Sequence, residues 1–177
     1  MLTSTINGRT WYWLTFLAFG IQGIFFATWV SRTPEIQKLL DLDTAQMAIF
    51  TFMLAIGSLS ALVLVGPLIG LYGTRIVLIV SYTLGPVALT AIGFFAEAGN
   101  LVGASISLLF VGFAAGAGGL AVNIEGANVD RESPKSLLPS LHGAFSVGSL
   151  IGGALGTIAI VAGVDVFFNF LYVSLFL

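Results

Sequence analysis

The sequence contains no cysteine and very few charged side chains. Its 177 residues include 6 Lys or Arg, 8 Asp or Glu and a single His. The absence of cysteine excludes disulfides, thiolate metal sites and cysteine catalysis, and one histidine excludes a multi-histidine metal site within one chain. Six cations spread along the whole length cannot form the basic stripe that nucleic acid requires. We therefore expect no nucleic-acid partner, no bound metal and no cofactor.

Apolar residues dominate the composition. They make up 58% of the chain, against 8% for charged residues, and the mean hydropathy is +1.06. A water-soluble domain usually has roughly 25% charged residues, so an ordinary cytosolic enzyme is excluded. The composition predicts an all-α integral membrane protein in contact with the lipid bilayer.

Stretches without Lys, Arg, Asp or Glu mark the expected membrane spans. A helix that crosses a hydrocarbon core of about 30 Å needs about 20 apolar residues. We predict spans at 11–31, 44–71, 76–96, 101–124 and 138–163, followed by an incomplete sixth span at 166–177. At about 1.5 Å per residue the last segment crosses less than the full core, so we interpret the sequence as a six-helix unit with a truncated sixth helix.

Helix-capping patterns separate the predicted spans. Thr33-Pro34 is expected to cap and begin a short interfacial helix, because proline is favoured at the first helical position. Asp43 and Gln46 have the spacing of a capping box at the start of the second span. Gly73 is expected to end that span.

The basic residues predict the orientation in the membrane. Arg9, Arg75, Arg131 and Lys135 fall on the side of the N-terminus, and Arg32 and Lys38 fall on the other side. Because cytoplasmic loops carry an excess of Lys and Arg, this distribution predicts a cytoplasmic N-terminus.

Glycines recur at helical spacing in two spans. Gly112, Gly116 and Gly119 lie with Asn123 along one face of the fourth span, and the fifth span has two overlapping small-xxx-small steps from Gly148 to Gly156. Small residues allow membrane helices to approach closely. These faces predict tight helix packing.

Polar residues near the first connection form one candidate site. Gln22 lies near the middle of the first span, and Trp29 shares its helical face. A glutamine in lipid either bonds a neighbouring helix or binds a hydroxylated ligand, and both interpretations stay open. Trp29 fits an interfacial belt, but Arg32 and the rigid Thr33-Pro34 just beyond it indicate a vestibule.

A second polar group lies between the fourth and fifth spans. His142, Ser146 and Ser149 form a stripe on the fifth span, and Asn123 and Glu125 lie at the same end of the fourth. A short connection makes the two helices antiparallel neighbours, so we expect His142 to lie near Asn123 or Glu125. Such a pair can titrate or bind a polar solute, and a structural clamp is the alternative.

His142 and Ser146 also raise the possibility of an intramembrane serine protease. The segment G-A-F-S-V-G at 143–148 lacks the spacing of a G-x-S-x-G elbow, and both side chains come from one helix without evident oxyanion donors. We predict no catalytic residue and no enzymatic activity.

The segment that ends the second span resembles the loop motif of the major facilitator superfamily (MFS), G-x-L-x-D-R-x-G-R-K. Residues 66–75 read GPLIGLYGTR and match at Gly66, Leu68, Gly73 and Arg75. The aspartate position of the motif holds Gly70 and its first arginine position holds Leu71. The charge network of the family's cytoplasmic gate is therefore altered in this chain.

Three further segments are similar to the bacterial sugar-permease-like branch that includes fucose permease. They are WVSRTPEI at 29–36, Asn123 with Glu125, and LHGAFSVG at 141–148. Together these resemblances imply the six-helix N-terminal half of an MFS transporter in the inner (plasma) membrane. The two halves of such a transporter rock about a central site near the midplane.

The resemblance also implies roles for individual residues. Gln22, Trp29 and Asn123 are implied as contacts for a small polar solute such as a sugar. The residues implied in gating or coupling are Arg32, Gly73, Arg75, Glu125, His142 and Ser146. Coupling to a proton would use Glu125, His142 or a residue of the missing half.

Two other interpretations remain open at this point. The chain is a non-transporting membrane protein, either a truncated product or an assembly subunit, or a second copy of the chain supplies the missing C-terminal half. Continuation of the sequence past Leu177 distinguishes the first of these from a transporter half.

Overall fold

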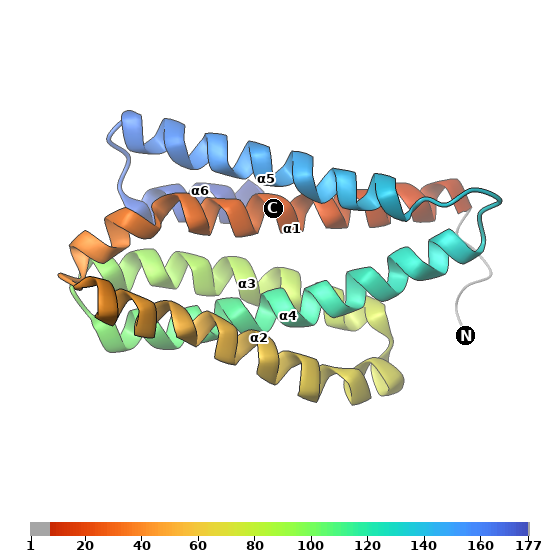
Figure 1. Ribbon diagram of the computed structural model, residues 1–177, viewed down its shortest axis with the longest axis horizontal. Helices are drawn as coiled ribbons and strands as arrows, with labels where there is room; N and C mark the ends of the chain where they lie inside the picture. The colour runs from red at the N-terminus through yellow and green to blue at the C-terminus, as the bar shows by residue number, and fades with distance from the viewer. Residues whose placement is uncertain (1–7, 177) are drawn as a thin grey trace.

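The computed structural model describes residues 8–176, and all of its regular structure is helical, as predicted. The helices are α1 (Gly8–Leu39), α2 (Thr44–Tyr72), α3 (Thr74–Glu97), α4 (Leu101–Arg131), α5 (Leu138–Val161) and α6 (Val166–Phe176). The first five are long and apolar enough to cross a membrane, and α6 is a shorter apolar helix. They run side by side along the long axis of the molecule (Figure 1).

The helices pack in an order that differs from their order along the chain. α1 lies between α5 and α4, α4 packs against α2 and α3, and α6 packs mainly on α3. The expectation that α4 and α5 are close neighbours is wrong, because α5 directs its glycine face at α1 and meets α4 only slightly. In Figure 1 the α1–α5 pair and the α2–α4 pair form the two sides of the bundle.

Glycines permit both of these close pairs. A Cβ on Gly148 or Gly152 would overlap backbone atoms of α1, and a Cβ on Gly112 would overlap the backbone of α2 at Leu54. The reverse also holds, since Gly23 on α1 meets the backbone of α5 and Gly57 on α2 meets that of α4. The predicted packing role of the glycine stripes is confirmed.

Two predicted helix boundaries are confirmed and one is wrong. Asp43 and Gln46 form the capping box, and Gly73 ends α2 with φ 79°, a conformation that glycine adopts readily. Pro34 begins no separate helix, because α1 continues through it to Leu39. Just before the proline, the Thr33 hydroxyl donates to the Trp29 carbonyl oxygen one turn earlier at 3.2 Å.

Acidic residues of earlier helices cap the starts of later ones. Asp130, in the last turn of α4, accepts bonds from the backbone N–H groups of Leu137 and Leu138 at the start of α5. Glu97, at the end of α3, accepts a bond from the backbone N–H of Phe167 in α6 at 2.8 Å. Each carboxylate satisfies donors that have no partner within their own helix, and so fixes the connection between two helices.

Candidate functional site

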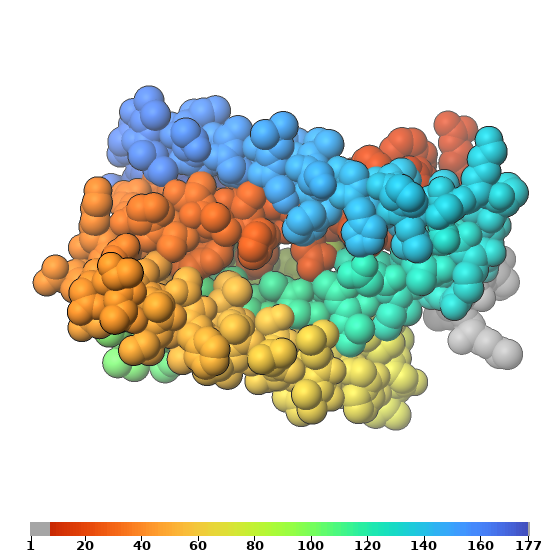
Figure 2. Space-filling view, in the orientation of Figure 1, coloured from red at the N-terminus to blue at the C-terminus, as the bar shows by residue number. Residues whose placement is uncertain are grey.

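A groove runs along one face of the bundle between α4 and α5. α1 packs against both helices, whereas they barely touch each other, so α1 forms the floor. Figure 2 shows the surface hollowed between α5 and α4, with atoms of α1 at the bottom of the hollow. We call this feature the α1–α4–α5 groove.

Gln22 and Asn123 meet at the same stretch of α4. The Gln22 Nε2 donates to the Ala115 carbonyl oxygen at 3.2 Å, and a Cβ on Gly119 would lie 3.0 Å from that nitrogen. The exposed Asn123 donates to the Gly119 carbonyl oxygen at 2.7 Å. Two of the three residues predicted to contact a solute are thus brought together, and each amide keeps its oxygen as a further acceptor.

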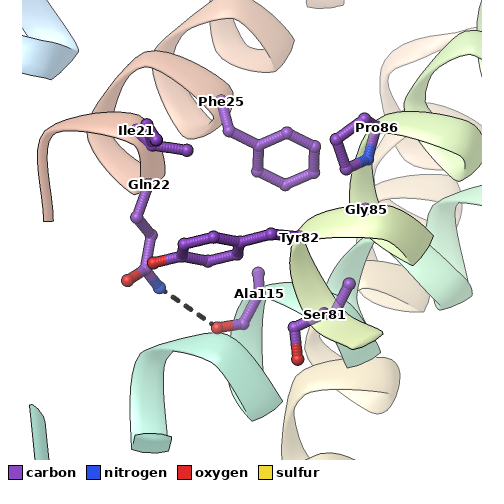
Figure 3. Close-up of a pocket in the computed structure, with 9 residues that line it drawn as sticks. Ile21, Gln22, Phe25, Ser81, Tyr82, Gly85, Pro86 and Ala115 are labelled. Atoms are coloured by element: carbon purple, nitrogen blue, oxygen red, sulfur yellow. Dashed lines mark hydrogen bonds between the residues drawn. The ribbon is translucent and has the colours of Figure 1, made fainter. Parts of the chain in front are cut away.

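A small cavity lies beside Gln22 between α1, α3 and α4. Its lining includes Phe25, Ser81 and Pro86, and its volume of about 20 Å³ suffices for one water molecule and not for a sugar. Figure 3 shows the Tyr82 ring lying next to the Gln22 amide. The Tyr82 hydroxyl donates to the Ala18 carbonyl oxygen at 2.9 Å, which ties α3 to α1 beside the Gln22 side chain.

Tyr82 was not found by sequence reasoning. A polar hydroxyl inside the apolar span at 76–96 was its signal, because buried tyrosine hydroxyls need a hydrogen-bond partner. That signal says nothing of which helix supplies the partner.

The structure places Trp29 and Arg32 inside the bundle. Trp29 is 3% exposed and its ring lies 6.2 Å from that of Phe50 on α2, so it lies in the apolar core and lines neither the cavity nor an open vestibule. Arg32 is 0% exposed. It donates to the Val164 carbonyl oxygen and pairs with Glu35 at 3.3 Å.

Glu125 joins three helices at the end of the bundle where α1 begins. Its carboxylate accepts bonds from the Trp11 indole N–H of α1 at 2.8 Å and from the Thr74 hydroxyl at the start of α3. The expected pairing of Glu125 or Asn123 with His142 is absent from residues 8–176. The reason is the packing of α5 on α1, which brings His142 against Phe19 with ring centroids 5.3 Å apart.

The remaining predicted gating residues lie at the surface. Ser146 is exposed on α5 and donates to the His142 carbonyl oxygen one turn earlier at 3.2 Å. Gly73 forms the one-residue connection between α2 and α3, Arg75 lies in the first turn of α3, and both are exposed. Within the part of the chain that the structure describes, Arg75 has no acidic partner, in keeping with the missing aspartate of the loop motif.

Known proteins with similar sequences are bacterial membrane proteins. The chain is 30% identical over 138 residues to an uncharacterized MFS-type transporter of Yersinia pestis. The aligned region covers 78% of this chain and 35% of the relative. It is 27% identical over 154 residues to the uncharacterized transporter y4wD of Sinorhizobium fredii, or 86% of this chain and 40% of the relative. It is 28% identical over 134 residues to the membrane protein MosC of Rhizobium meliloti, or 76% of this chain and 32% of the relative.

These relatives are described as transporters or as a membrane protein and not as enzymes. The chain spans between 32% and 40% of their lengths. No family model matches the sequence, and no solved structure matches it. Distant homology to MFS-type transporters is supported, whereas the narrower fucose-permease-like branch is not.

Proposed function

We propose that this chain, a distant homologue of MFS-type transporters, forms one half of a secondary transporter that moves a small polar solute, such as a sugar, by alternating access. The second half would come from further sequence or from a second copy of the chain. We place the transporter in the inner membrane with the N-terminus in the cytoplasm, in line with the distribution of Lys and Arg.

The observation that carries this proposal is that the amides of Gln22 and Asn123 both lie close to Gly119 on α4. Polar side chains inside membrane helices are costly and usually face a partner or a water-filled pathway. Two amides offer donors and acceptors that match the hydroxyl groups of a sugar. The groove is open on one side, as a half-site completed by a second set of helices would be.

The proposed coupling group is Glu125, with His142 as the second candidate. Glu125 is a half-buried carboxylate bonded to two neutral donors, Trp11 and Thr74. Proton binding would remove its charge and weaken both bonds, and this would loosen the contact between α1, α3 and α4. The other residues that we propose for gating, Ser146, Gly73 and Arg75, lie at the surface.

The absence of native cysteine allows a direct test of the groove. If water reaches these two positions, as the proposal requires, single variants Gln22→Cys and Asn123→Cys should react with a water-soluble thiol reagent in proteoliposomes. Leu62→Cys, at a half-exposed site on α2, is the matched lipid-facing control and should react slowly. Reaction of all three at the control rate would contradict an aqueous groove.

Solute protection then tests the function itself. Addition of the transported solute from a panel of sugars and polyols should slow the labelling of Asn123→Cys and leave that of Lys135→Cys, in the exposed α4–α5 connection, unchanged. Uptake of the same radiolabelled solute into proteoliposomes should exceed uptake into protein-free vesicles. Uniform labelling with every solute, together with no uptake, would favour a non-transporting subunit.

A further inference from the structure

Arg32 is a buried cation with unused hydrogen-bonding capacity. The residue is 0% exposed, yet within residues 8–176 its Nε and Nη1 atoms have no acceptor. Both of its bonds use Nη2, which donates to Val164 and pairs with Glu35. A guanidinium group carries five N–H donors, so most of the donors on this side chain are unmatched.

The unmatched donors of the Arg32 guanidinium favour the binding of an acceptor. Buried N–H donors without an acceptor are unfavourable in a protein interior, and they call for an explanation such as a bound ion or water. A planar guanidinium binds a carboxylate in a bidentate manner. The one carboxylate that pairs with Arg32 is that of Glu35, whose side chain is 37% exposed. This carboxylate can therefore leave Arg32 and be hydrated instead.

An open pocket is lined by both partners of Arg32, Glu35 and Val164, whereas the buried Arg32 does not itself line it. Its volume is about 370 Å³, and its lining includes Ser31, Glu35, Lys38 and Val164. Two of these residues are the present partners of Arg32, and Lys38 adds a second positive charge at the exposed rim. Asp165, next to Val164 in sequence, lies beyond salt-bridge distance from the guanidinium, since Arg32 pairs with Glu35 alone among the described acidic residues.

From this arrangement we propose that Arg32 and Lys38 form a binding site for a small monoanion of the carboxylate type, with Glu35 as a built-in competitor. The incoming anion enters the pocket past Lys38, displaces the Glu35 carboxylate and bonds the guanidinium of Arg32. The site lies near the far end of α1, away from the α1–α4–α5 groove, and does not depend on transport through that groove.

Trp29 provides the readout for a test. It lies three residues before Arg32 on α1, so the two side chains are neighbours on one helical face, and both are buried. The variant Trp11→Phe/Trp13→Phe leaves Trp29 as the single tryptophan. Iodide, a monoanion that quenches indole fluorescence, is titrated into this variant in a neutral detergent, and its retained fold is checked by circular dichroism.

We expect saturable quenching by iodide that acetate relieves competitively. Arg32→Gln should lower the iodide affinity about tenfold or more, because charge-assisted bonds are lost. Glu35→Gln should raise the affinity severalfold because the competitor is gone, whereas Lys38→Gln should weaken binding modestly. Repeating the titration with phosphatidylglycerol added distinguishes a free anion from a lipid headgroup, since a headgroup site would lose its iodide response.

Quenching that rises linearly with iodide and is equal in Arg32→Gln would overturn the proposal, since it would indicate collision in solvent. If Arg32→Gln fails to fold, Glu35→Gln decides, because it keeps the cation. Unchanged or weaker anion binding in Glu35→Gln would contradict the competitor role and with it the site.

Discussion

Glu125 illustrates at the residue scale how one side chain connects separate helices. Its two carboxylate oxygens bind donors from the start of α1 and the start of α3, and the residue itself belongs to α4. Both donors are neutral groups, and the Glu125 side chain is half-buried. Hydrogen bonds to a charged acceptor contribute about 1.5–3 kcal/mol each, which makes this contact one of the stronger polar links of the bundle.

Substitution of Glu125 should therefore destabilise the folded chain. We expect Glu125→Gln to lower the free energy of unfolding by about 1–2 kcal/mol, because an amide keeps one acceptor oxygen in place of two. The measurement is denaturation by sodium dodecyl sulfate in mixed micelles. Glu132→Gln, at the exposed end of α4, is the control and should change stability by less than about 0.5 kcal/mol.

Trp11 offers a second approach to the same contact. Trp11→Phe removes the indole donor and should cost about 1 kcal/mol or more, whereas Trp13→Phe, at a side chain that is 49% exposed, should cost little. The double variant with Glu125→Gln should lose less than the sum of the single losses, because both changes break one bond. Strictly additive losses would mean that the bond adds nothing measurable in the membrane protein.

The sequence was a good guide to which residue types matter and a poor guide to their partners. Gln22 and Asn123 were predicted because amides are unusual in apolar spans, and the structure brings them together at Gly119. The partners of Trp29 and His142 could not be predicted, because helical periodicity fixes the residues that share a face and not the helix that the face meets. His142 consequently contacts Phe19 rather than Glu125.

At the scale of elements, close helix pairs depend on glycine at particular positions. Gly112→Ala places a methyl group into the α2 backbone at Leu54, and the helices must separate or shift to accommodate it. We expect a loss of about 1–3 kcal/mol, as in other overpacked sites. Stability is again measured by denaturation in mixed micelles.

Gly143→Ala is the matched control for this prediction. Gly143 also lies within a helix, but nothing lies within 4 Å of an added Cβ there. Alanine is the better helix former by up to about 1 kcal/mol, so this variant should be equally stable or more stable. Equal losses in the two variants would show that glycine acts through helix propensity and not through helix contact.

The connection between α4 and α5 depends on a side-chain cap. Asp130→Ala removes the acceptor for the N–H groups of Leu137 and Leu138 and should cost about 1 kcal/mol, as for other helix caps. Hydrogen exchange at those two amides, followed by mass spectrometry, should accelerate. Exchange at Gly103, whose amide is capped by Asn100, should stay unchanged and serves as the internal control.

The helices themselves were predictable because their lengths follow from the thickness of the bilayer. The capping box of Asp43 and Gln46 and the turn at Gly73 were also readable, since each is a local pattern. The continuation of α1 through Pro34 and the caps by Glu97 and Asp130 were not. The latter two join residues of different helices, and only the packed bundle determines which ends meet.

At the scale of the whole molecule, the bundle has two ends with different connections. The α2–α3 and α4–α5 connections lie at the end where α1 begins, and the other three lie at the opposite end, as Figure 1 shows. If the N-terminus is cytoplasmic, a membrane-impermeant thiol reagent added to intact cells should label Lys38→Cys and Ala98→Cys, which replace exposed residues.

Lys135→Cys, in the α4–α5 connection, should resist the reagent until the cells are permeabilised. The reverse pattern, with Lys135→Cys labelled from outside and Lys38→Cys protected, would invert the proposed topology. Mixed labelling of every site would indicate that both orientations occur in the membrane.

The pairing of α1 with α5 also determines when α1 can complete its packing during synthesis. The Thr28 hydroxyl of α1 donates to the carbonyl oxygen of Gly152, which lies 124 residues later in the chain. A ribosome that adds about 5–20 residues per second needs roughly 6–25 s to make that stretch. Throughout this interval the part of α1 up to Thr28, which includes Gln22, has already been synthesised, while its main packing partner α5 is still incomplete. α1 is thus fully packed only after α5 has been made, because α5 supplies most of its contacts with the rest of the bundle.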